Sequence, residues 1–187
     1  MAPKLNIEQK SYKRIFQQSW LELEKEFQNG NVNPRHENDV VCYLYYALAN
    51  AFKKKGFPLY FIRTEDTINF EEESMRPDLN LNNRVFVEVK MYGLSDYRRG
   101  WEKRQQNIEY TADKLRQYVA YQRSTSSVLV RHPILAIWFK KRENSTGRSS
   151  SYSKNDFFLS EDLEKKLNIE KRKYAKEITL LYGPRKP

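Results

Sequence analysis

The sequence predicts an α/β fold in which helices flank a mixed β-sheet of about five strands. Apolar residues recur at helical spacing in several long segments, and shorter apolar or alternating segments of strand length lie between them. At 187 residues and 39% hydrophobic content, the chain can bury one sizeable core. No internal repeat or second domain is evident, so residues 1–187 are predicted to form a single domain.

Amphipathic spacing and end signals predict four helices, at residues 8–28, about 34–54, 108–122 and 160–176. The second has the clearest signals. Asn33 is the predicted N-cap, Pro34 takes the first helical position, and Gly56 follows the end.

Segments rich in apolar and β-branched residues predict strands at residues 58–67, 77–81, 85–90, 133–140 and 178–182. The acidic segment at 71–73 and the serine-rich segment at 143–156 are predicted loops. The elements suggest an N-terminal helix at 8–28, a core at about 34–140, and a C-terminal helix and strand within 155–187.

The strongest chemical pattern is Pro77-Asp78 followed, after an asparagine-rich turn, by the strand sequence VFVEVK at 85–90. Side chains alternate across a strand, so its three valines share one face while Glu88 and Lys90 share the other. The valine face should pack on the core. The strand therefore holds an acid and a lysine side by side with little freedom to move.

The turn before this strand decides whether Asp78 reaches the same place. A two-residue turn would put Asp78 and Glu88 on opposite faces. A three-residue turn at residues 82–84 pairs Leu81 with Val85, and so sets Asp78 opposite Glu88. Cross-strand neighbours lie ~5 Å apart at Cβ, so the two carboxylates could share a divalent ion. We predict the three-residue turn.

Glu37 is the third candidate acid. It falls on the apolar stripe of its helix with Val41, Leu44 and Leu48, where a carboxylate is costly unless it has a partner. The alternative is a glutamate at the rim of the core, stabilised by the helix dipole. For Asp78, Glu88 and Lys90, the alternative is a surface hairpin with an ordinary ion pair.

This arrangement resembles the PD-(D/E)xK nuclease superfamily, which includes restriction endonucleases and archaeal Holliday-junction resolvases. The resemblance covers about residues 34–140 and rests on Pro77-Asp78, Glu88-Val89-Lys90 and Glu37. It implies a restriction-endonuclease-like sheet and a Mg²⁺-dependent nuclease that hydrolyses DNA. The ion, for which Mn²⁺ can substitute, would be held by Asp78 and Glu88, with the Val89 carbonyl and Glu37 helping directly or through water. Lys90 would orient or help deprotonate the attacking water, or stabilise developing charge.

A second, looser pattern is Gln117-x-x-x-Tyr121, which places both side chains on one face of the predicted helix. It resembles the additional motif of RecB-type exonucleases in the same superfamily. Some members of that branch carry an iron–sulfur cluster, which a chain with one cysteine cannot bind. The alternative is a polar helix face packed at the sheet edge.

The net charge of +10 favours a polyanionic partner. Residues 34–90 hold eight Lys/Arg against nine Asp/Glu, whereas residues 91–123 hold seven against four. Phosphate contact and base stacking are predicted for a basic segment with interleaved aromatic residues: Arg98, Arg99, Trp101, Lys103 and Arg104. The alternative is an exposed basic loop without a ligand.

Other features of the sequence place weaker restrictions on the function. The apolar stretch Val40 to Phe52 is too short to cross a bilayer, and Cys42 has no partner for a disulfide, so we expect a cytoplasmic protein. Neither His36 nor His132 has the spacing of a catalytic triad or a zinc site. The competing hypotheses are a catalytically inactive nucleic-acid-binding module of the same fold and a purely structural domain. The sequence leaves three alternatives open: whether DNA is cut internally or from its ends, which form of DNA is cut, and whether the protein forms a homodimer.

Overall fold

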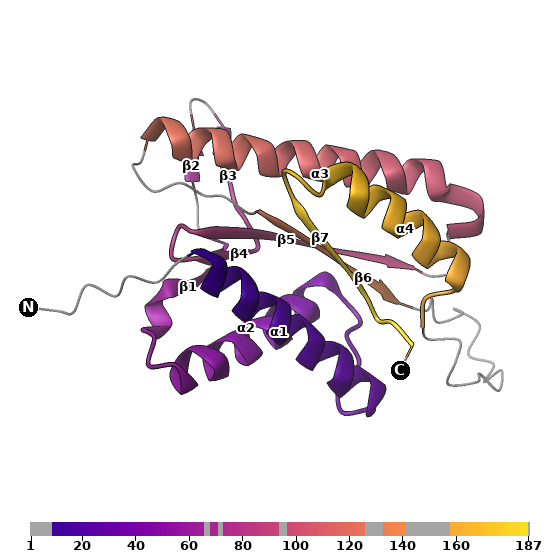
Figure 1. The fold of residues 1–187 in the computed structure, drawn as a ribbon, viewed down its shortest axis with the longest axis horizontal. Helices are drawn as coiled ribbons and strands as arrows, with labels where there is room; N and C mark the ends of the chain where they lie inside the picture. Colours follow the sequence, from indigo (N-terminus) through magenta and orange to yellow (C-terminus); the bar gives the residue numbers. More distant parts are fainter. Residues whose placement is uncertain are drawn as a thin grey trace, which may run out of the picture.

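The five-stranded mixed sheet and its flanking helices confirm the predicted α/β fold class (Figure 1). A computed structural model describes residues 9–65, 68–70, 73–93, 97–125, 133–140 and 158–186. The helices are α1 (Gln9–Gln28), α2 (Glu37–Lys54), the short 3-10 helix η1 (Leu59–Phe61), α3 (Tyr97–Thr125) and α4 (Glu161–Tyr174). The strands are β1 (Ile62–Thr64), β2 (Ile68–Phe70), β3 (Glu73–Met75), β4 (Leu79–Leu81), β5 (Val85–Gly93), β6 (Ile134–Lys140) and β7 (Thr179–Gly183).

The strand order in the main sheet is β1-β4-β5-β6-β7, and β2 pairs with β3 separately. β4 runs antiparallel to β1 and β5, whereas β5, β6 and β7 run parallel to one another. The parallel half is built by helical crossovers, because parallel neighbours cannot be joined by a tight turn. α3 connects β5 to β6, and α4 precedes β7.

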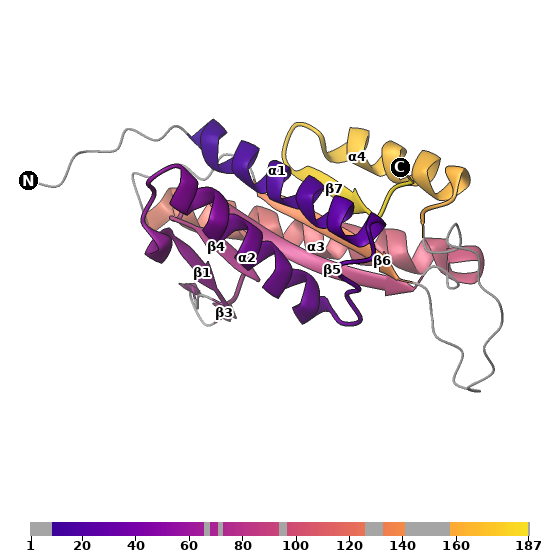
Figure 2. The same ribbon diagram turned by 90° about the horizontal axis from the view of Figure 1, so that it is seen from below.

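Helices cover both faces of the sheet, α1 and α2 on one side and α3 and α4 on the other (Figures 1 and 2). The three valines of β5 lie in the core beneath α1 and α2, as their alternation predicts. Phe86 points the other way and is equally buried beneath α3 and α4. β6 is therefore buried from Ile134 to Phe139, since both of its faces meet helices.

The turn between β4 and β5 has the predicted three residues. Leu81 pairs with Val85 and Leu79 with Val87, the register that sets Asp78 opposite Glu88. Asn82 and Asn83 both have positive φ angles, +51° and +54°, which asparagine tolerates better than most residues.

The predicted start of α2 at Pro34 is wrong. The helix begins at Glu37 with His36 as N-cap. Asp39 causes this shift, because its Oδ2 accepts hydrogen bonds from the backbone amides of Arg35 and His36, at 2.8 and 2.9 Å. That contact satisfies amides that would otherwise lack partners at a helix start. Glu37 is therefore the first residue of α2.

Other predicted boundaries also need correction. The first part of the predicted strand 58–67 is η1, Ile62–Thr64 pairs with β4, and residues 66–67 lie outside the described part of the chain. Glu73, in the predicted acidic loop, begins β3. The basic segment before residue 108 belongs to α3, which continues across a kink at Gly100. The Arg, Lys, Glu and Gln residues of this segment favour a helix. The segment has too few apolar residues to show an apolar stripe, so the sequence pattern did not reveal the helix.

Within the described residues, no helix combines the length and the apolar character needed to cross a membrane.

Candidate active site

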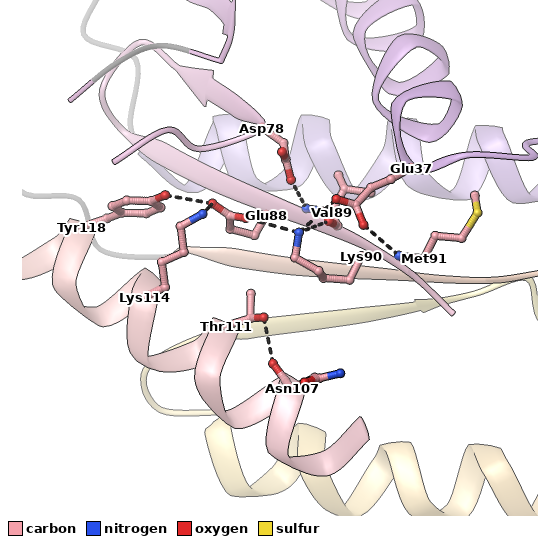
Figure 3. Close-up of polar contacts among 10 residues, drawn as sticks. All are labelled: Glu37, Asp78, Glu88, Val89, Lys90, Met91, Asn107, Thr111, Lys114 and Tyr118. Carbon is pink, nitrogen blue, oxygen red and sulfur yellow. Dashed lines mark hydrogen bonds and ion pairs between the residues drawn. The ribbon is translucent and has the colours of Figure 1, made fainter. Parts of the chain in front are cut away.

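The candidate site lies where β5 extends beyond the end of its neighbour β4. β4 ends its pairing with β5 at Leu79, whereas β6 accompanies β5 as far as Gly93. Beyond Glu88, the strands that the structure describes leave the edge of β5 on the β4 side open. Two acids cover it: Asp78 Oδ2 accepts a hydrogen bond of 2.6 Å from the Val89 amide, and Glu37 Oε2 accepts one of 3.2 Å from the Met91 amide (Figure 3).

The ammonium group of Lys90 contacts several other groups of the site. Its Nζ donates to Glu37 Oε1 at 3.0 Å and to the Val89 carbonyl at 2.8 Å. The same ammonium lies 3.6 Å from Glu88 Oε2. Burial by itself lowers the pKa of Lys90, but the bond to Glu37 and the nearby acids outweigh it and raise that pKa above its usual value. Lys90 is therefore a charged donor at neutral pH.

Glu88 lies deepest, with 1% of its surface exposed. Its Oε1 accepts a hydrogen bond of 2.9 Å from the Tyr118 hydroxyl and lies 2.9 Å from Lys114 Nζ. Burial first, and then the charge of Glu88, raise the pKa of Tyr118 far above its usual value, so the phenol keeps the proton that it donates. Both partners come from α3 (Figure 3).

The pKa of Asp78 departs from its ordinary value. Burial, followed by the charge of Glu88, raises its pKa to about 6. The Val89 amide and Lys90 lower that pKa, and Glu37 raises it again. The site thus holds three carboxylates against the ammonium groups of Lys90 and Lys114, and the excess negative charge is not balanced within this group.

The donors present suit a hard divalent cation. Asp78, Glu88 and the Val89 carbonyl offer oxygen atoms, which Mg²⁺ and Mn²⁺ prefer. Both Glu37 oxygens accept hydrogen bonds, from Lys90 and from the Met91 amide. Among the residues that the structure describes, no three His, Cys, Asp or Glu side chains form a ready metal cage. A cation here would depend on two carboxylates and a backbone carbonyl.

Four predicted residues thus come together: Glu37, Asp78, Glu88 and Lys90. The pair expected on α3 was Gln117 and Tyr121. Gln117 is exposed, and the side chain of Tyr121 lies outside the described part of the chain. Lys114 and Tyr118, three positions earlier with the same spacing, contact Glu88.

A signal for Tyr118 was available in the sequence. Tyr118 lies three positions after Leu115 and ten after Ile108, on the apolar stripe that buries this helix. A hydroxyl on a buried stripe needs a hydrogen-bond partner, and the acid of the neighbouring strand is one.

The predicted DNA contacts are only partly placed. The side chains of Arg98 and Arg99 lie outside the described part of the chain. Trp101 is half-buried against the core beneath α3 and α4. Arg104 is 8% exposed, with its guanidinium 4.8 Å from the centre of the Tyr92 ring, so it faces inward. Lys103 is exposed, as a phosphate contact requires.

Comparisons of this chain with protein-family models, with curated proteins and with solved structures found no match.

Proposed function

We propose that this chain is a Mg²⁺-dependent nuclease that hydrolyses phosphodiester bonds in DNA. One observation carries the proposal: Asp78, Glu88 and Lys90 meet at the open edge of β5, and Glu37 from α2 meets Lys90 there. A surface hairpin with a simple ion pair would not bury Glu88 to 1% exposure. Nor would it raise the pKa of Asp78 to about 6.

The residues of the candidate site would have different roles in phosphodiester hydrolysis. Asp78, Glu88 and the Val89 carbonyl would hold the ion beside the scissile phosphate. Bound there, Mg²⁺ would supply positive charge that acidifies an attacking water and neutralises the non-bridging oxygens. Because the ion offsets the repulsion between Asp78 and Glu88, binding would also relieve a cost that the free protein bears.

Lys90 would act on the reacting atoms directly. Its ammonium, held by Glu37 and by the Val89 carbonyl, can donate to the attacking water or to a phosphate oxygen that gains charge in the transition state. Glu37 would be a positioning residue, since it fixes Lys90 and satisfies the Met91 amide. Lys103, which is exposed on α3, would contribute a phosphate contact.

We place this activity in the cytosol, where the lone free thiol at Cys42, exposed on α2, would remain reduced. DNA is the proposed partner, and sedimentation measures whether the chain forms a homodimer.

A cleavage panel tests the proposal. The protein is incubated with supercoiled plasmid and with end-labelled single strands, duplexes, flaps and four-way junctions, in Mg²⁺, Mn²⁺ or EDTA. Nicked plasmid would show internal cutting, and short labelled products would show cutting from ends. Glu88→Gln should abolish all products, whereas Asp162→Asn, which removes an acid paired with Lys166 on the surface of α4, should not.

DNA binding without metal-dependent products on any substrate would favour the inactive binding module instead. Neither binding nor products would leave a structural role as the better account.

A further inference from the structure

α3 holds Glu88 by one of its two oxygens. The Tyr118 hydroxyl and the Lys114 ammonium both lie 2.9 Å from Oε1. Among the described residues, the donor that lies nearest Oε2 is Lys90, at 3.6 Å, which is beyond ordinary hydrogen-bond length. Figure 3 shows Glu88 between the two α3 side chains and Lys90.

The two donors are themselves well fixed. Tyr118 is fully buried, its ring packs edge-on against Phe86 with centroids 5.7 Å apart, and the backbone of Arg76 hydrogen-bonds to its side chain. The Lys114 ammonium lies 5.5 Å from the centre of the same ring. Helix spacing places both residues on one face of α3, one turn apart. Rotation of the Glu88 carboxylate would break both contacts.

We infer that Tyr118 and Lys114 are positioning residues that retain Oε1 of Glu88, so that this carboxylate offers a divalent ion Oε2 alone. The inference rests on the proposed function, because it concerns the ion that function requires. Its consequence is selectivity. Mg²⁺ and Mn²⁺ accept carboxylates through one oxygen in compact octahedral sites, whereas Ca²⁺ takes more oxygens and often both from one carboxylate.

The affinity ratio between Mn²⁺ and Ca²⁺ isolates this role. Removing Lys114 also removes a positive charge, which by itself strengthens binding of any cation. Both ions carry the same charge, so that contribution cancels in the ratio. A general loss of folding cancels as well, since it lowers the active fraction for both ions. Only a change in how Glu88 is presented should move the ratio.

Isothermal titration with MnCl₂ and with CaCl₂ is carried out on the full chain and on Tyr118→Phe, Lys114→Met and the double variant. Each single change should lower the Mn²⁺ preference several-fold, and the double change about tenfold, the usual scale for groups that orient a metal ligand. Matched controls are Tyr182→Phe, which loses a hydroxyl bonded to Asn168, and Lys173→Met, which loses a surface lysine. Both should keep the ratio of the unchanged protein.

The possible results separate the two proposals. If the unchanged chain binds both ions and the ratio stays constant in all three site variants, the inference is overturned and the metal site stands. If the unchanged chain binds neither ion, the proposed nuclease function is overturned, and the inference with it.

Discussion

Lys90 Nζ lies 3.0 Å from Glu37 Oε1, although 53 positions separate the two residues in the sequence. The contact ties the first turn of α2 to the middle of β5. It places a charged donor at the open strand edge and gives the Glu37 carboxylate a partner. Because Glu37 Oε2 also accepts from the Met91 amide, one side chain holds both the lysine and the strand that carries it.

Replacing Lys90 with alanine should abolish cleavage while DNA binding stays nearly unchanged. In the proposed mechanism the ammonium would act on the reacting atoms, and such groups contribute roughly 100-fold or more to the rate. Product formation in Mg²⁺ and DNA affinity in Ca²⁺, with substrate integrity checked on a denaturing gel, measure the two effects. Turnover equal to that of the unchanged protein would remove Lys90 from the mechanism.

Glu37→Gln should lower kcat by about 10- to 100-fold, as expected of a group that orients another, and should lower the affinity for Mn²⁺ only by the smaller effect of losing one nearby negative charge. The variant loses the ion pair that positions Lys90 but keeps the size of the side chain. Kinetics as a function of Mn²⁺ concentration separate the two quantities. A large loss of Mn²⁺ affinity would instead make Glu37 a direct ligand.

Asp78 should make stability depend on pH. Its pKa is about 6 in the folded chain, raised mainly by burial and then by Glu88, against an ordinary value of 3.8. Between about pH 4 and pH 6 the folded state therefore binds a proton that the unfolded state releases, so stability rises as the pH falls through this window. Above pH 6, the buried charge costs stability.

Melting temperatures in EDTA at pH 5 and pH 7.5 measure this effect. Raising the pH should destabilise the unchanged protein more than Asp78→Asn, which has no charge to bury. Stabilisation by Mg²⁺ should shrink below about pH 6, because a proton on Asp78 then competes with the ion. Identical pH profiles for the two proteins would contradict the assignment.

The turn before β5 should tolerate glycine but not a β-branched residue. Asn83 has a φ of +54°, and its side-chain oxygen accepts from Asn80 Nδ2 at 2.9 Å. Asn83→Val should cost about 1–3 kcal/mol in the free energy of unfolding, the usual cost of a strained backbone conformation. Asn83→Gly should cost less, since glycine adopts positive φ freely. Urea unfolding of both variants tests the difference.

Much of the site could be predicted because it depends on local geometry. Alternation along β5 puts Glu88 and Lys90 on one face whatever surrounds the strand. The length of the turn sets the register, and the observed pairing of Leu81 with Val85 follows from three turn residues. The position of Asp78 opposite Glu88 is a consequence of these two local facts.

The contributions of α3 could not be predicted in the same way. A helix repeats every 3.6 residues, so several i, i+4 pairs look equally suitable in a polar sequence. Gln117 and Tyr121 have the same spacing as Lys114 and Tyr118. Only the rotation of α3 on the sheet, set by the burial of Ile108 and its stripe, decides which pair faces Glu88. The inward position of Arg104 against Tyr92 has the same origin.

The sequence by itself determined the strand that carries Glu88 and Lys90, and the turn that brings Asp78 beside them. Short-range backbone geometry was sufficient for both. The tertiary structure alone decided that Glu37 reaches Lys90 and that Tyr118 and Lys114 reach Glu88. Those contacts join elements distant in the chain, and they depend on how two helix layers pack against opposite faces of one sheet.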